Sequence, residues 1–195
     1  MSLRQTQKAN TRSAIKRVAK HAFLTKGIEA TSTRFLSEQA GIAVGTLFVH
    51  FPDKLSLVKD IFFDEMDVAL REAADAQSAC QSPSDYLLQM ADVLFSFYDK
   101  YAEFARLVLF DSLAHGGFHA KQMDVIVEGV AGRFKQVGVD DNTAAIFAEN
   151  MAANYFMVLL KGIPSGVLGR AAIDHLGKLN LPFDVSYKNA LKKGH

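Results

Sequence analysis

Apolar side chains recur at the three- to four-residue spacing of an α-helix along most of this chain, and this periodicity constrains the fold more than any other feature. In the first such segment the spacing is carried by Ile15, Val18, Ala19, Ala22 and Phe23. Valine, isoleucine and threonine do not gather into the alternating runs of β-strands, and there are only four prolines. Amphipathic helices bury such apolar stripes against one another. We therefore predict an all-α protein.

Capping residues and helix breakers set the expected bounds of these helices. Gly27 and Pro52 each end a helix, and the pair Ser82-Pro83 begins one. The expected helices span about 10–26, the two turns before Gly41, 44–50, 54–77, 83–100, 101–114, 118–137, 141–161 and 165–180. Residues 181–195 are expected to form a loose tail. A boundary before the long helix divides the chain into domains 1–53 and 54–195.

Composition excludes several protein classes. A single cysteine, Cys80, rules out an intrachain disulfide and favours a reducing, cytoplasmic setting. No uninterrupted apolar run approaches the roughly 18–20 residues of a membrane span. We therefore expect a cytoplasmic protein with no membrane partner.

Basic side chains are concentrated in the first 60 residues. This part holds ten lysines and arginines but four acidic residues, a surplus of +6, whereas the whole chain carries +1. Among them, Arg4, Lys8 and Arg12 are expected to precede the first helix. Such an imbalance favours contact of this segment with a polyanion, although a merely solvated basic surface gives the same count.

Two short helices after the first one are joined by a tight turn at Gly41, a residue that tolerates left-handed backbone angles. Ala40 is small enough for the two helices to cross closely. This order predicts a helix-turn-helix motif. In that motif the second short helix, here 44–50, lies in the major groove of DNA.

From Gly27 to about residue 58 the sequence resembles the tetracycline-repressor (TetR) family of transcription factors. The resemblance is carried by Thr-Ser-Thr-Arg at 31–34, Leu-Ser-x-x-Ala-Gly-Ile at 36–42, Gly-Thr-Leu-Phe-x-His-Phe at 45–51 and Asp-Lys-x-x-Leu at 53–57. It implies an N-terminal three-helix DNA-binding domain joined by a long helix to a C-terminal helical domain for ligand binding and dimerisation. The implied function is a ligand-responsive regulator, a repressor that binds palindromic operator DNA as a homodimer and that a small hydrophobic effector releases.

The resemblance also assigns residues to the DNA contact. It implies phosphate contacts by Thr33, Thr46, His50 and Lys54, base contacts by Arg34, Val44 and Gly45, and a phenylalanine, Phe48, where the family usually has tyrosine. The tyrosine hydroxyl that would contact a phosphate is therefore absent. The usual serine cap of the recognition helix is replaced by alanine at position 43, so we expect that helix to lack a side-chain cap.

The second domain is rich in aromatic side chains, which form either a packed core or, as the resemblance implies, the lining of an effector pocket. The expected pocket residues are Phe62, Met66, Phe95, Tyr98, Phe104, Leu107, Phe110, Phe147, Met151 and Tyr155. Residues 141–161 are apolar on two faces, so a twin subunit is expected to cover one of them. The expected dimer residues are Ala145, Ala152, Phe156, Leu168, Ala172 and Leu176.

Other functions have less support in the sequence. An activator, or a DNA-binding protein without an effector, is the alternative among regulators, and a small helical enzyme or ligand carrier is the alternative from another class. No phosphate-cradling glycine loop or nucleophile elbow occurs, so we expect no enzyme activity and no cofactor. Asp111, His115 and His119 have ligand-like spacing, but Gly116-Gly117 interrupts them, and we expect no metal site. The sequence leaves open whether these three residues bind anything.

Overall fold

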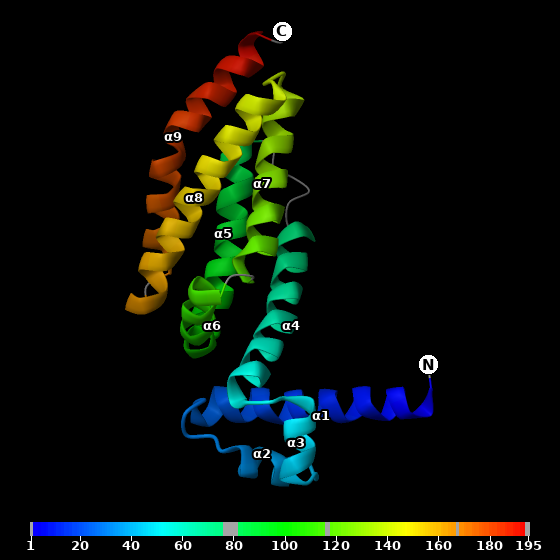
Figure 1. Cartoon of the computed structure of the whole chain (residues 1–195). Coiled ribbons are helices and arrows are strands. Elements are labelled where there is room, and N and C mark those ends of the chain that lie inside the picture. Colours follow the sequence, from blue (N-terminus) through cyan, green and yellow to red (C-terminus); the bar gives the residue numbers. More distant parts are fainter. Residues whose placement is uncertain (1, 76–81, 116–117, 167, 194–195) are drawn as a thin grey trace. The chain divides into compact units, whose positions relative to one another are not determined.

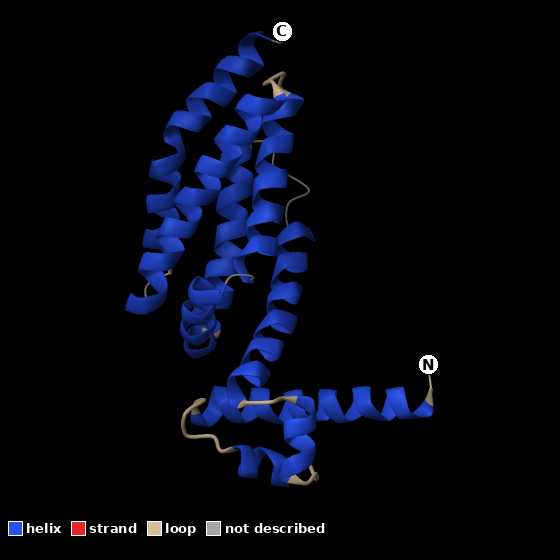
Figure 2. Ribbon diagram, viewed as in Figure 1, coloured by secondary structure: helices blue, strands red, loops and turns tan. Residues whose placement is uncertain are grey.

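The computed structural model describes residues 2–75, 82–115, 118–166 and 168–193. Within these ranges the chain forms helices and no strand (Figure 2), which confirms the predicted all-α fold. In chain order the helices are α1 (Leu3–Lys26), α2 (Thr33–Gln39), α3 (Val44–His50), α4 (Lys54–Asp75), α5 (Pro83–Lys100), α6 (Ala102–His115), α7 (Phe118–Gln136), α8 (Asp141–Ser165) and α9 (Arg170–Lys193).

The chain divides into two compact units. Unit 1 comprises Met1–Glu65 and Glu103–Val108, and unit 2 comprises Met66–Ala102 and Leu109–His195. Helices α4 and α6 therefore each contribute to both units. These compact units do not test where a separately folding domain begins, so the domain boundary before residue 54 stays a prediction.

In unit 1, α1 packs against the short helix α2, and α2 packs against α3 (Figure 1). The core of this unit contains Ile15, Phe23, Leu36 and Leu47, all fully buried. The turn between α2 and α3 uses Gly41 at a φ of +67°, in the left-handed region that favours glycine. The predicted helix-turn-helix motif is therefore present.

Unit 2 is a bundle in which α5, α7, α8 and α9 run alongside one another (Figure 1). Helix α8 supplies much of the core through Ala148, Met151 and Tyr155, which are fully buried. Helix α5 begins where predicted, because the Ser82 hydroxyl accepts a hydrogen bond from the Asp85 N–H at 3.0 Å and proline follows at the first helical position.

Two predicted helix bounds at the ends of the chain are wrong. Helix α1 begins at Leu3, because Ser2 and Gln5 form a capping box in which each side chain accepts a hydrogen bond from the other residue's N–H. Arg4, Lys8 and Arg12 therefore lie on α1 and do not precede it.

At the other end, the segment predicted as a loose tail is part of α9, which continues through Pro182 to Lys193. Packing compensates for the hydrogen bond that proline cannot make. The Phe183 ring packs edge-on against Phe147, and the Tyr187 ring packs edge-on against Phe134. Helix α8 likewise runs past Pro164 to Ser165.

Helix α8 is the one helix among the described residues that is long and apolar enough to cross a membrane by length and composition. A core helix of a soluble bundle meets the same criteria. The buried side of α8 forms the core of unit 2, so its composition is weak evidence for a membrane span.

Candidate functional site

The outward face of α3 is the most distinctive exposed surface of unit 1. Val44, Phe48 and Val49 lie on this face with 38%, 45% and 74% of their surface exposed, and Gly45 lies between them. Leu47 points the other way and is fully buried. The exposed face thus carries apolar groups and no charge, which suits contact with thymine methyl groups in a major groove.

Gly45 has open space around it. Apart from the adjacent residues and the nearby backbone of α3 itself, a Cβ built at this position meets no atom within 4 Å, and its backbone does not need the left-handed region. Internal packing therefore gives no reason for glycine here. As predicted for Ala43, no side chain caps α3.

The start of α2 presents two of the predicted DNA residues. Ser32 caps this helix by accepting a hydrogen bond from the Phe35 N–H at 3.1 Å, and Thr33, the first helical residue, is half-buried. The exposed Arg34 guanidinium pairs with Glu38 at 3.1 Å. Exposed pairs of this kind contribute about 0–1 kcal/mol, so Arg34 can leave Glu38 at little cost.

Part of the basic surplus is neutralised inside unit 1. Arg12 and Lys16 of α1 pair with Asp60 of α4 at 2.8 and 2.9 Å, and Lys16 also pairs with Asp64. Burial works against these charges, but the hydrogen bonds from Arg12 and Lys16 outweigh it and hold the pKa of Asp60 below its ordinary value. Lys20 continues this ladder by pairing with Glu65.

The two basic residues predicted to flank the recognition helix as phosphate ligands differ in their surroundings. The Lys54 ammonium donates to three backbone carbonyls of unit 1, at residues 28, 29 and 31, and is thereby occupied. His50 is half-buried, and its Nδ1 has no hydrogen-bond partner. Burial, followed by the nearby charges of Lys8 and Arg12, lowers the pKa of His50, which favours the neutral ring.

A hydrogen-bonded chain of three side chains crosses the core of unit 2. The Tyr98 hydroxyl donates to Gln122 Oε1 at 2.9 Å, and Gln122 Nε2 donates to the Tyr155 hydroxyl at 2.6 Å. Phe95 stacks on Tyr155 with ring centroids 5.4 Å apart. Burial raises the pKa of both tyrosines, so the hydroxyls stay protonated. Gln122 was not foreseen in the sequence, because a lone glutamine on α7 carries no pattern that signals burial.

The predicted effector residues are divided between the two units. Phe95, Tyr98, Met151 and Tyr155 are buried together in unit 2, whereas Phe104 packs edge-on against Phe23 in the core of unit 1. The remaining predicted residues do not share one environment: Phe62 and Met66 are buried, Phe147 is half-buried, and Leu107 and Phe110 are exposed.

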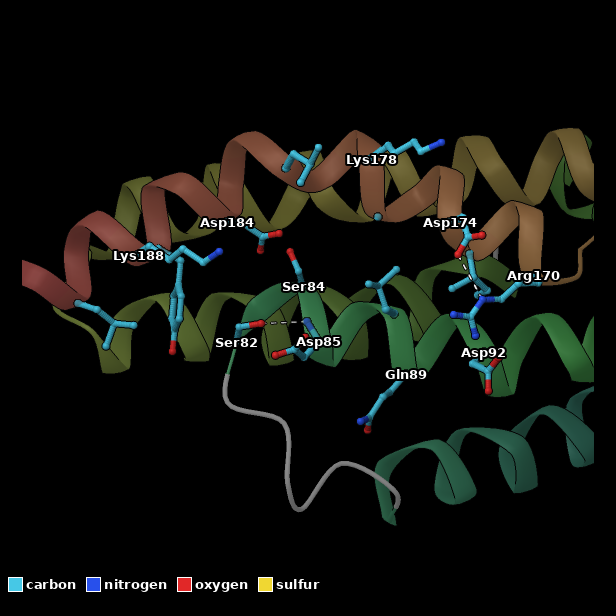
Figure 3. A pocket seen from close by; sticks show the side chains of 16 residues that line it. Ser82, Ser84, Asp85, Gln89, Asp92, Arg170, Asp174, Lys178, Asp184 and Lys188 are labelled. Atoms are coloured by element: carbon cyan, nitrogen blue, oxygen red, sulfur yellow. Dashed lines mark hydrogen bonds and ion pairs between the residues drawn. The ribbon is translucent and has the colours of Figure 1, made fainter.

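An open groove of about 1190 Å³ runs between α5 and α9 in unit 2 (Figure 3). Its walls carry charged residues of both signs, including Asp92 and the ion pair of Arg170 with Asp174 at 3.3 Å. The Ser84 hydroxyl points toward α9 and has no hydrogen-bond partner. The groove was not foreseen in the sequence and is unlike the apolar pocket that was predicted.

The predicted dimer residues also divide. Ala152, Leu168 and Leu176 are buried within their own unit, whereas Ala145, Phe156 and Ala172 are partly accessible. The outward face of α8 is instead formed by Ile146, Ala153, Met157 and Leu160. These four side chains are at least partly exposed, and the exposed Glu149 and Asn150 lie between Ile146 and Ala153 on the same side of the helix.

Within the described side chains, no group of three or more histidine, cysteine, aspartate or glutamate residues is placed to hold a metal ion. Asp111 lies on α6, but the side chains of His115 and His119 fall outside the described part of the structure.

Comparison with known proteins gives consistent matches. Residues 15–61 match the family model described as bacterial regulatory proteins of the tetR family. The HTH-type transcriptional repressor KstR2 of Mycolicibacterium smegmatis is 25% identical over 139 residues, which cover 65% of this chain and 68% of that protein.

Solved structures share the fold. A TetR-like regulator from Rhodococcus sp. RHA1 has a TM-score of 0.60 at 18% identity, covering 90% of this chain and 96% of that one. The Thermus thermophilus repressor FadR, in complex with lauroyl-CoA, has a TM-score of 0.63 at 19% identity, covering 88% and 91%.

Proposed function

Because this chain belongs to the TetR family of transcriptional regulators, which are DNA-binding proteins and not enzymes, we propose that it is a repressor that binds a palindromic operator as a homodimer and releases it when a hydrophobic effector binds. The observation that carries this proposal is the outward face of α3. An uncharged apolar face on the second helix of a helix-turn-helix motif has the chemistry to read base edges.

The homodimer is supported by the outward face of α8. Ile146, Ala153 and Met157 are exposed on one side of α8, although Glu149 and Asn150 separate the first from the other two, and exposed apolar groups gathered on one face support a partner contact. A two-fold dimer would present two α3 helices to half-sites about 34–36 Å apart, or a multiple of that distance. The proposed interface therefore uses these accessible residues of α8 in place of Ala152, Leu168 and Leu176, which are buried within their own unit.

The effector is proposed to enter the aromatic core of unit 2 near Phe95, Tyr98, Gln122 and Tyr155. Aromatic surface would hold an apolar chain, and the Tyr98–Gln122–Tyr155 hydrogen bonds could be exchanged for one carbonyl of the ligand. FadR, which shares the fold, was solved with lauroyl-CoA, so an acyl-chain ligand is the effector class we propose. We also propose a cytoplasmic location, where operator DNA is found.

The test begins with a mobility-shift assay on the DNA that flanks the gene of this protein. We expect a discrete complex that lauroyl-CoA or a related acyl-CoA dissociates. Binding of lauroyl-CoA should also be weaker in the presence of the operator, since linkage makes the two effects reciprocal. Failure to shift any flanking fragment would contradict operator binding, whereas equal ligand affinity with and without DNA would contradict only the effector.

A further inference from the structure

Two basic side chains hold the two ends of the helix-turn-helix segment from inside unit 1. The segment leaves α1 through residues 28–31, passes through α2 and α3, and ends at His50 and Phe51. Lys54 donates hydrogen bonds to backbone carbonyls at its beginning, and Arg12 donates one at its end. The family resemblance assigned a different role, phosphate binding, to Lys54.

At the beginning of the segment, the Lys54 ammonium donates to the carbonyl oxygens of Ile28, Glu29 and Thr31 at 2.8, 3.5 and 3.3 Å. An ammonium has three donors, and these three acceptors can use them all. Ile28 and Thr31 are 3% and 1% exposed. Withdrawal of the ammonium toward a phosphate would remove a donor from the carbonyl of the buried Thr31, which is costly, whereas the Ile28 carbonyl would keep its hydrogen bond from the Thr31 N–H at 3.4 Å.

Ile28 is also held through its N–H. The Ile28 N–H donates to Glu103 Oε1 at 2.8 Å, so Lys54 and Glu103 fix the carbonyl and the amide of neighbouring peptide groups. Glu103 lies in the first turn of α6, in the part of that helix that belongs to unit 1. An acidic and a basic side chain thus set the position from which α2 begins.

At the end of the segment, Arg12 makes three contacts at once. One guanidinium nitrogen donates to the His50 carbonyl at 2.7 Å, another pairs with Asp60 at 2.8 Å, and the guanidinium lies over the Phe51 ring at 4.1 Å. The planar fork of arginine makes this geometry possible, and lysine cannot reproduce it. Arg12 thereby ties the last turn of α3 to α4.

We infer that Lys54 and Arg12 are positioning residues that pin the two ends of the helix-turn-helix segment and that neither is a phosphate ligand. This inference rests on the operator binding proposed above. Its consequence is that both residues raise affinity for the operator by fixing where α3 sits. They contribute little to binding of unrelated DNA, which depends on phosphate contacts.

The test uses the full-length protein and a duplex selected from a random library by the wild type, with a scrambled duplex of equal length beside it. For Lys54→Gln and Arg12→Lys we expect about 10-fold weaker binding of the selected duplex, unchanged binding of the scrambled one, and an unchanged salt dependence. Lys26→Gln is the control, because it removes the same charge from unit 1 while its ammonium lies over the Phe35 ring.

A phosphate ligand would behave differently. Its removal would weaken both duplexes alike and reduce the slope of log K against log salt by about 0.9 for each phosphate that is no longer neutralised, and that result would overturn the inference. Unchanged affinity for both duplexes would overturn it as well.

Glu103→Ala gives a test of opposite sign. Removal of a negative charge should strengthen DNA binding if charge alone matters, whereas loss of the Ile28 hydrogen bond should weaken operator binding if the pin matters. We expect weaker binding.

Amide hydrogen exchange in the free protein supplies a readout without DNA. Lys54→Gln and Glu103→Ala should accelerate exchange at residues 28–33, and Arg12→Lys should do so at 48–51. Unchanged exchange at these residues would refute the positioning role of Lys54 and Arg12, whether or not a duplex is selected. Failure to select any duplex would count against the proposed function instead.

Discussion

Replacement of Gly45 by alanine is expected to stabilise the protein and weaken operator binding. Gly45 is the second residue of α3, its backbone needs no left-handed angle, and an added Cβ meets nothing within 4 Å. Alanine in a helix is favoured over glycine by about 0.5–1 kcal/mol, and a first-turn position takes the lower end. For a chain of this size, about 0.5 kcal/mol corresponds to a rise of roughly 1–2 °C in Tm.

The added methyl group should have the opposite effect on DNA binding. It would project from the exposed face of α3 and keep the backbone from approaching the base edges. The expected loss for each half-site is that of one good base contact, about 1–3 kcal/mol or roughly 5- to 150-fold in affinity. The same change at Gly132 of α7, where a Cβ also meets nothing within 4 Å, is the matched control. It should raise Tm without changing affinity.

Thermal unfolding followed by circular dichroism and fluorescence anisotropy with a labelled operator provide the two measurements. A lower Tm for Gly45→Ala would refute the claim that packing leaves this position open. An unchanged operator affinity would refute the claim that this face of α3 approaches DNA.

Three further predictions concern other parts of the molecule. If His50 contacts a phosphate, its lowered pKa should rise on binding, so operator affinity should increase as pH falls from about 8 to 6, and His50→Gln should flatten that profile. Met157→Glu on the exposed face of α8 should yield monomers in sedimentation experiments, and a dimer at micromolar concentration would contradict the proposed interface. Gly129→Ala should lower the free energy of unfolding in urea by about 1–3 kcal/mol, because the new Cβ would overlap the Tyr86 ring, and wild-type stability would contradict that packing.

Local signals predicted the fold best. The end of α3 and the start of α5 agree with the prediction, because Pro52 and the pair Ser82-Pro83 act on the helix ends next to them. The continuation of α9 beyond Pro182 was missed for the opposite reason. It depends on contacts of Phe183 and Tyr187 with α8 and α7, which no local pattern contains.

The sequence predicted which residues lie at the candidate site, but it did not predict which partners each side chain contacts. The resemblance assigned Val44, Gly45 and Phe48 to the DNA contact, and in the structure all three are exposed on α3. A resemblance, however, transfers a residue type and not its partners. Lys54 occupies the family's position, but its ammonium is directed to backbone carbonyls, and this depends on how residues 28–31 fold around it.

The charge of unit 1 shows the same limit and yields a quantitative prediction. The surplus of +6 was counted over residues 1–60, a window that ends before Asp64 and Glu65. In the structure those two residues and Asp60 neutralise Arg12, Lys16 and Lys20.

With these three and Lys54 held inside unit 1, at most six of the ten basic side chains can reach phosphates. At about 0.9 for each phosphate contact, the slope of log K against log salt should be no steeper than about −5 per protomer, whereas about ten contacts would give about −9. A salt titration of operator binding distinguishes these values. A slope near about −9 would mean that Arg12, Lys16, Lys20 and Lys54 all leave their partners on DNA, and it would contradict the inference that Lys54 and Arg12 are not phosphate ligands.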